Sequence, residues 1–355
     1  MDVASLAPGV EEVLEKHRFD VGALERYLRE HLEGFSGPPV IGQFRGGQSN
    51  PTYCLGAGGR RYVLRRKPPG KLLPSAHAVD REYRVITALG PTGFPVPKTY
   101  VYCGDESVIG TPFYVMDYVP GRVFADPLLP GVTPKERAAM YDSFNECLAR
   151  LHTVDFAAIG LADFGRSGQY VARQIHRWTG QYRASETERI EAMERLIEWL
   201  PPHIPAEDPT TLVHGDFRPG NTLMHPTEPR VVAVLDWELS TLGHPLSDLA
   251  YNCIPYHLPP EDSLGGVAGV GLAASGIPTE EEYLTAYCRR TGRTGVADWE
   301  FYVAFSLFRL AAIAQGIMGR FIAGTANDPE AAERGRRARP LAEAGWALIE
   351  KRRGT

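Results

Sequence analysis

The segment 214–221, His-Gly-Asp-Phe-Arg-Pro-Gly-Asn, constrains the fold of this chain more than any other feature. It is followed by the apolar run 231–235 and then by Asp236. The Pro-Gly pair predicts a turn that directs Asn221 back towards the preceding loop, and the apolar run predicts a short buried strand. The sequence therefore predicts a loop and a strand that together present one carboxamide and two carboxylates, Asp216 and Asp236.

Such a set of groups suits phosphoryl transfer from a metal-bound nucleoside triphosphate to a hydroxyl, which needs positioning and charge neutralisation rather than covalent chemistry. Asp216 would orient the hydroxyl or accept its proton, and Arg218 would bring a fixed cation to the moving phosphate. Asn221 and Asp236 would offer oxygen ligands to Mg²⁺, a hard cation that prefers oxygen. Protein kinases carry the same groups in the same order.

Each member of the motif also has a purely structural interpretation. An Asp after Gly often caps a turn, and Asn221 could simply end a loop. The combination, in this order around an apolar strand, favours the functional interpretation. His214 is different, because we expect it to hold the loop backbone by hydrogen bonds, with metal ligation or acid/base work as the alternatives.

The rest of the chain predicts a β-rich first part and a helical second part, divided near Pro120-Gly121. Strands are expected at 39–44, 52–55, 61–66 and 113–119, and helices at 9–33 (with a break possible at 20–22), 78–89, 134–154, 186–200 and over most of 278–353. We therefore predict an α+β, bilobal fold, with an antiparallel β N-lobe carrying a helix (1–116) and a hinge and helical C-lobe (117–355).

Bulk properties exclude several classes. The formal charge of −5 gives no reason to expect nucleic-acid binding, and the apolar stretches are interrupted by polar residues, so no membrane span is expected. The start of the chain lacks the features of a secretory signal. The five cysteines are scattered, which predicts reduced core thiols and a cytoplasmic location.

The chain resembles the aminoglycoside phosphotransferase-like family, which has a protein-kinase-like fold. Within that family it is most similar to the kinase-like domain found alone in bacteria or joined to some acyl-CoA dehydrogenases. The residues that carry the resemblance lie in four segments: Gly46–Tyr53, Val63–Arg84, His214–Arg218 and Asp236–Asp248.

The resemblance implies ATP and Mg²⁺ as cofactors and assigns further residues to the nucleotide. The loop Gly46–Asn50 would cover the phosphates through its backbone N–H groups, with Gly47, Ser49 and Asn50 in contact. Met116 and Tyr118 lie in the implied hinge, whose backbone would bind adenine. A plain hairpin turn remains the alternative for the loop.

An ion pair is also implied. Arg65 occupies the place of the kinase β3 lysine, and Glu82 that of its helical partner. An arginine here departs from the general kinase pattern, since guanidinium is larger and bidentate, so either Arg65 or Lys67 could reach the phosphates. Asp248 matches a buried structural aspartate. His244 stands where the wider family has Asp, which we interpret as a loop variation.

The acceptor is expected to be a small molecule with a hydroxyl. The late helical part carries arginines that form either a solvated basic helix face or a site for an anionic substrate, whereas its acidic residues lie at predicted helix starts. With the implied link to acyl-CoA dehydrogenases, this predicts a hydroxyacyl-CoA of the 4-hydroxy type. The alternatives are an aminoglycoside, choline or homoserine kinase, and a catalytically silent pseudokinase. The arginines are Arg309, Arg320, Arg334, Arg336, Arg337 and Arg339.

Overall fold

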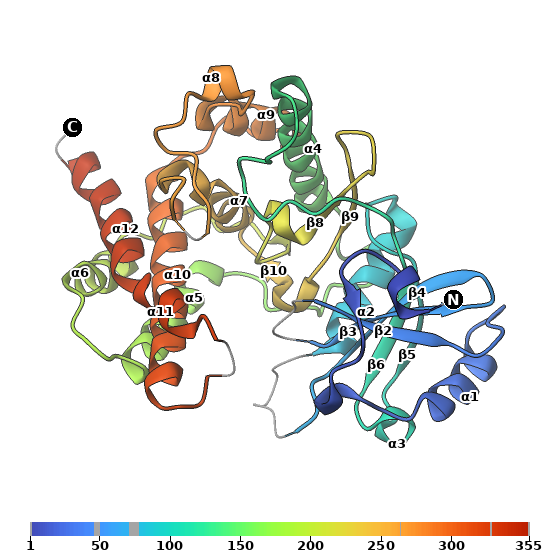
Figure 1. The fold of residues 1–355 in the computed structure, drawn as a ribbon. Coiled ribbons are helices and arrows are strands. Elements are labelled where there is room, and N and C mark those ends of the chain that lie inside the picture. The colour runs from blue at the N-terminus through green and yellow to red at the C-terminus, as the bar shows by residue number, and fades with distance from the viewer. Residues whose placement is uncertain (1, 46–49, 71–77, 263, 327–328, 354–355) are drawn as a thin grey trace. The chain divides into compact units, whose positions relative to one another are not determined.

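The computed structural model describes residues 2–45, 50–70, 78–262, 264–326 and 329–353 (Figure 1). The chain divides into two compact units. The first comprises Met1–Gly121 and Val232–Glu238, and the second comprises Arg122–Val231 and Leu239–Thr355. The first unit is built on an antiparallel sheet and the second is mostly helical, which confirms the predicted α+β class.

The sheet of the first unit has six strands in the order β1-β2-β3-β4-β6-β5, all antiparallel to their neighbours. The four predicted strands are confirmed, whereas β5 was not predicted. Its segment carries Tyr and Val but follows two prolines, which obscured the strand pattern. The strands are β1 (Val10–Glu11), β2 (Val40–Phe44), β3 (Thr52–Ala57), β4 (Arg60–Arg66), β5 (Thr99–Cys103) and β6 (Phe113–Asp117).

Helices of the first unit cover the two faces of this sheet. Side chains alternate between faces along a strand, so Leu64 and Val115 pack with α1 (Val21–His31) on one face. Arg65 and Tyr114 lie opposite each other in register on the other face, which α2 (Val79–Leu89) covers. This alternation brings Arg65 to the helix that carries Glu82.

The helix predicted over 9–33 was wrong for its first half. Only Val21–His31 is helical, and it begins where the Asp20 side chain accepts a hydrogen bond from the Ala23 N–H (2.9 Å). Residues before this cap are extended or in a 3₁₀ turn, and Val10 is buried where β1 pairs with β2. An N-cap aspartate thus defines the helix start, at the break foreseen as possible.

The second unit is organised around α10 (Trp299–Ile322), which packs against α5, α7, α11 and α12 (Figure 1). Among the described residues, α10 is the one helix long and apolar enough to cross a membrane, and 78% of its most apolar window is buried in the fold, as in a core helix. The helices are α4 (Pro134–Thr153), α5 (Tyr170–Ala184), α6 (Glu191–Trp199), α7 (Pro245–Cys253), α8 (Leu272–Ser275), α9 (Glu280–Thr291), α11 (Ala331–Arg336) and α12 (Ala338–Arg353). The prediction of 186–200 corresponds to α6, and α5 was not predicted.

A two-stranded ladder positions the motif. β7 (Thr211–Val213) pairs antiparallel with β10 (Thr241–Gly243), and Val213 lies opposite Thr241. The loop that begins at His214 leaves the end of β7, and α7 begins two residues after β10. The short strands β8 (Thr222–Met224) and β9 (Val231–Val234) follow the motif loop along the chain.

Candidate functional site

The motif loop turns sharply at Gly215, which has a φ of +84°. A Cβ at this position would lie 2.8 Å from the backbone oxygen of Leu239, so both conformation and space demand glycine. His214 is fully buried, and its Nδ1 accepts the Asp216 N–H at 3.2 Å. The expectation that His214 holds the loop backbone is confirmed.

Asp248 of α7 binds the backbone of the same loop. Its carboxylate accepts the backbone N–H groups of His214 (2.7 Å) and Gly215 (2.8 Å), and it lies 3.3 Å from Nε2 of His152. Burial alone would raise the pKa of Asp248, but the hydrogen bonds from His152 and the loop hold that pKa below its ordinary value. The predicted structural role of Asp248 is confirmed.

The side chain of Asp216 is held by several donors. Asn221 Nδ2 donates to Oδ2 of Asp216 (2.7 Å) and to its backbone oxygen (2.9 Å). The half-exposed Arg218 lies with Nε 3.4 Å from Oδ1. The 3₁₀ turn Pro219–Asn221 brings Asn221 back, as the Pro-Gly pair predicted. Within the second unit the structure therefore brings three of the predicted residues together, Asp216, Arg218 and Asn221.

A fourth residue at Asp216 was not assigned to the site from the sequence. The Tyr251 hydroxyl donates to Oδ1 of Asp216 at 2.5 Å. Burial raises the pKa of Tyr251, and the neighbouring Asp216 raises it further, so the phenol stays a donor. The available signal was helical spacing, because Tyr251 lies three residues after Asp248 and therefore on the same face of α7.

In the first unit, Arg65 joins two carboxylates. Its Nε lies 2.8 Å from Glu82, and its Nη2 lies 2.5 Å from Asp236. Glu82 is completely buried and also accepts hydrogen bonds from Asn50 (2.6 Å) and Tyr114 (3.1 Å). Burial raises the pKa of Glu82, and Arg65 opposes that rise. Arg65, rather than Lys67, therefore forms the kinase-type ion pair with Glu82.

Asp236 has an unusual backbone conformation. Its φ of +65° lies in the left-handed region, which costs energy for a residue with a Cβ. The following Trp237 is fully buried and donates from Nε1 to the Val234 oxygen at 3.0 Å, which anchors the turn. The Asp236 side chain is one-third exposed.

The remaining nucleotide residues stay predictions. Gly47 and Ser49 lie outside the described residues. Asn50 is buried, and its amide is directed to Glu82. Met116 belongs to β6, opposite Val63, and the guanidinium of Arg61 lies 4.3 Å from the ring centroid of Tyr118.

His244, which stands where an aspartate was expected, has a structural contact in this chain. It is the N-cap of α7, where its Nδ1 accepts the Leu246 N–H at 3.2 Å. Its ring stacks on Tyr302, whose hydroxyl lies 3.1 Å from Nε2. Burial lowers the pKa of His244 to about 4, so the cap is uncharged at neutral pH.

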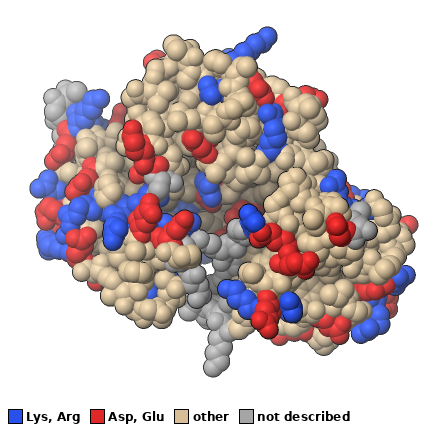
Figure 2. Space-filling view, viewed as in Figure 1, with Lys and Arg blue, Asp and Glu red and all other residues tan. Residues whose placement is uncertain are grey.

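The arginines of the late helical part fall into two groups. Arg309 is buried and donates to the Gly215 oxygen at 2.8 Å, so its expected place on a basic surface was wrong. Arg337 pairs with Asp262 at 2.6 Å and is mostly buried, whereas Arg336 is exposed. Figure 2 shows basic side chains interspersed with acidic ones where α6, α11 and α12 reach the surface.

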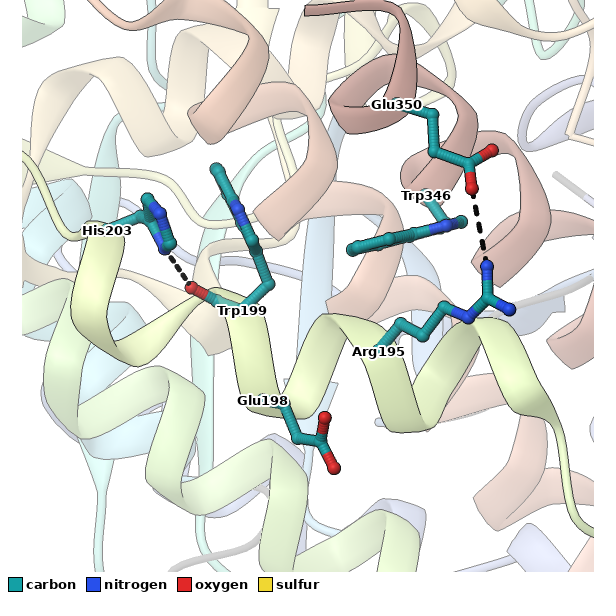
Figure 3. A pocket seen from close by; sticks show the side chains of 6 residues that line it. All are labelled: Arg195, Glu198, Trp199, His203, Trp346 and Glu350. Carbon is teal, nitrogen blue, oxygen red and sulfur yellow. Dashed lines mark hydrogen bonds and ion pairs between the residues drawn. The ribbon is translucent and has the colours of Figure 1, made fainter. Parts of the chain in front are cut away.

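A separate hollow of about 710 Å³ lies between α6 and α12 (Figure 3). The side chains that line the hollow contact one another. The ring centroids of Trp199 and His203 lie 4.1 Å apart in a stacked arrangement, and Arg195 Nη1 lies 3.3 Å from Glu350 Oε1. None of the predicted site residues lines it. The hollow is therefore distinct from the motif loop.

Comparisons with known proteins show the family of this chain. The model of the phosphotransferase enzyme family matches residues 40–302. The chain is 49% identical over 331 residues to mouse acyl-CoA dehydrogenase family member 10, and 45% identical over 349 residues to human acyl-CoA dehydrogenase family member 11. These matches cover 93% and 96% of this chain but only 31% and 44% of those proteins. The chain thus spans less than half the length of these relatives.

Solved structures give the same result. A protein of Ralstonia eutropha JMP134, with a provisional assignment as an aminoglycoside phosphotransferase, is 54% identical with a TM-score of 0.87, covering 94% of this chain and 99% of that one. Spectinomycin phosphotransferase, solved with ADP and spectinomycin, has a TM-score of 0.62 at 12% identity, covering 94% and 98%, and shows the shared fold alone. The predicted family resemblance and kinase-like fold are confirmed.

The Arg65 pair generates a first prediction. Replacing Arg65 by Met leaves the buried Glu82 without its cation, so we expect about 3–5 kcal/mol lower unfolding free energy at pH 8. The folded-state pKa of Glu82 would rise further above its unfolded value, so the deficit should shrink as pH falls and Glu82 is protonated. Urea denaturation at pH 5 and 8 measures this. The exposed Arg60→Met on the same strand is the control, and an equal loss in both variants would contradict the prediction.

His244 generates a second prediction. Below about pH 6.5 the imidazole of His244 is protonated in the unfolded chain, whereas in the folded chain it is protonated only below about pH 4. The free energy of unfolding therefore decreases as the pH falls through this range. His244→Asn keeps a capping acceptor but cannot titrate. We expect it to lose about 3 kcal/mol less than wild type between pH 7 and pH 4. Denaturation at each pH measures this.

The charged groups that act on His244 are Arg293, Asp208 and His152. Exposed His176→Asn is the matched control and should follow the wild-type profile. Parallel profiles for wild type and His244→Asn would show that His244 is not the titrating group.

Proposed function

Since the chain belongs to the phosphotransferase enzyme family, which makes it a kinase of small-molecule hydroxyl groups, we propose that it moves the γ-phosphate of Mg·ATP to a hydroxyacyl-CoA. The reaction type is inferred from the Asp216 carboxylate in the loop after β7. Its Oδ2 accepts a hydrogen bond from Asn221 Nδ2 at 2.7 Å. A carboxylate fixed in this way can orient an acceptor hydroxyl for in-line attack and take its proton as the bond forms.

Each of the two predicted ligands carries an oxygen of the kind that magnesium prefers. Mg²⁺ usually takes one or two protein oxygens and completes its shell with phosphate and water. Because the Asn221 amide nitrogen donates to Asp216, its remaining polar atom is the oxygen that a cation would use. Asp236 contributes a partly exposed carboxylate. In the described residues no group of three or more His, Cys, Asp or Glu side chains is arranged to hold a metal ion.

Two arginines of the chain can stabilise the negative charge of the phosphates. Arg65 is held by the buried Glu82, so its guanidinium is oriented before any nucleotide binds. Arg218 is half-exposed beside Asp216, where it can contact the transferring phosphate. Bound Mg²⁺ would neutralise charge on the phosphates. Fixed cations of this kind stabilise the charge that develops during transfer.

The proposed acceptor is supported by the names of the relatives and by the basic residues of the late helical part. The relatives that match over nearly the whole chain are named acyl-CoA dehydrogenase family members, although the chain spans under half of each. Arg337 is mostly buried and pairs with Asp262 at 2.6 Å, so its charge is already matched within the second unit. Arg336, its exposed neighbour, could bind the phosphates of coenzyme A.

The reaction type is tested with Asp216→Asn, which keeps the shape of the side chain but removes its charge. We expect transfer to fall by about 10²–10⁴-fold while Mg·ATP binding, measured by calorimetry, is retained. Exposed Glu198→Gln is the control and should retain full activity. Failure of the wild-type protein to bind Mg·ATP would favour a catalytically silent binding module instead.

The acceptor is tested with a panel read by ADP release and ³¹P NMR. Purified protein with Mg·ATP or Mg·GTP receives 4-hydroxyacyl-CoAs, the matching free hydroxy acids, aminoglycosides, choline and homoserine. We expect turnover of the CoA esters over the free acids, because the basic residues recognise the CoA phosphates.

Arg336→Ala should then raise KM for the CoA ester about tenfold and leave KM for ATP unchanged. Turnover confined to an aminoglycoside, choline or homoserine would overturn the acyl-CoA proposal while leaving the kinase activity intact.

A further inference from the structure

Helix α7 contacts the motif loop through three of its residues, at positions 248, 251 and 252. Asp248 binds the N–H groups of the loop's first two residues, and Asn252 Nδ2 donates to the Phe217 oxygen at 3.3 Å. Between them Tyr251 reaches Asp216 itself, at 2.5 Å. Positions three and four apart on a helix share one face, so a single face of α7 supports the whole loop.

We propose that Tyr251 is a positioning residue that holds the Asp216 carboxylate in the one rotamer that can orient the acceptor hydroxyl, a role that rests on the proposed phosphotransfer. The two carboxylate oxygens have separate donors: Tyr251 on Oδ1 and Asn221 on Oδ2. A carboxylate with one donor could rotate about its terminal bond, whereas two donors on different oxygens prevent rotation. Such pre-orientation is what in-line attack requires.

Arg309 of α10 fixes the tyrosine in turn. Its guanidinium carbon lies 5.3 Å from the centroid of the Tyr251 ring, within the range of a cation–π contact. The same guanidinium donates to the Gly215 oxygen at 2.8 Å and is buried. Arg309 therefore ties the ring of Tyr251 to the backbone next to Asp216, so the hydroxyl and the carboxylate keep a constant separation.

Tyr251→Phe removes only the hydroxyl and tests this role in the full chain with saturating Mg·ATP and 4-hydroxyacyl-CoA. We expect kcat to fall about tenfold to a hundredfold, the effect of losing one hydrogen bond to a charged group, with KM for Mg·ATP unchanged. Tyr141→Phe is the matched control, because this buried hydroxyl donates to the Pro127 oxygen at 2.7 Å, away from the loop. It should leave kcat unchanged at a similar thermal stability.

A structural readout keeps the test independent of the acceptor. Crystal structures of wild type and Tyr251→Phe should show Asp216 in one rotamer in the former and in several in the latter. An ordered, unmoved Asp216 in the variant, or an unchanged kcat, overturns the positioning role. A raised kcat or a lower KM for the acceptor would instead show that the tyrosine hydroxyl occupies the acceptor's place.

Absence of turnover with every acceptor, together with a rotamer change in the variant, would reject the proposed function and leave the positioning of Asp216 by Tyr251 standing. The two proposals therefore fail by different measurements.

Discussion

The motif loop depends on one buried carboxylate. Asp248 accepts two successive backbone N–H groups of the loop and a hydrogen bond from His152, and burial makes each of these contacts costly to lose. Because α7 carries Asp248, the helix cap at His244 and the packing of α7 on α10 determine where the loop lies. The carboxylate of Asp216 is thus placed by the core of the second unit.

The first unit uses the same physical principle, a buried carboxylate surrounded by hydrogen-bond donors. Glu82 is buried among the donors Arg65, Asn50 and Tyr114, and the arginine extends from it to Asp236. An arginine suits this position because its planar group can bind two carboxylates at once, which an ammonium does with less directionality. Replacement of the kinase lysine by arginine therefore preserves the ion pair and adds a contact to the predicted metal ligand.

Substitution at His244 shows how a fold tolerates a changed motif. Aspartate and a neutral imidazole both accept a backbone N–H at a helix N-terminus, so the cap survives the change in charge. What the imidazole adds is a ring that stacks on Tyr302, and what it loses is a negative charge. The loop variation inferred from the sequence is in physical terms a neutral cap with a pH-dependent cost.

The sequence by itself determined the order of the chemical groups: Asp216, Asn221 and Asp236 around a turn and a strand, together with the strands that carry Arg65. These follow from local periodicity and from short spacings. Only the tertiary structure decided that Tyr251 contacts Asp216 and that Arg309 lies inside the fold rather than on a basic surface. Such contacts join helices distant along the chain, and no local pattern records which faces of two helices will meet.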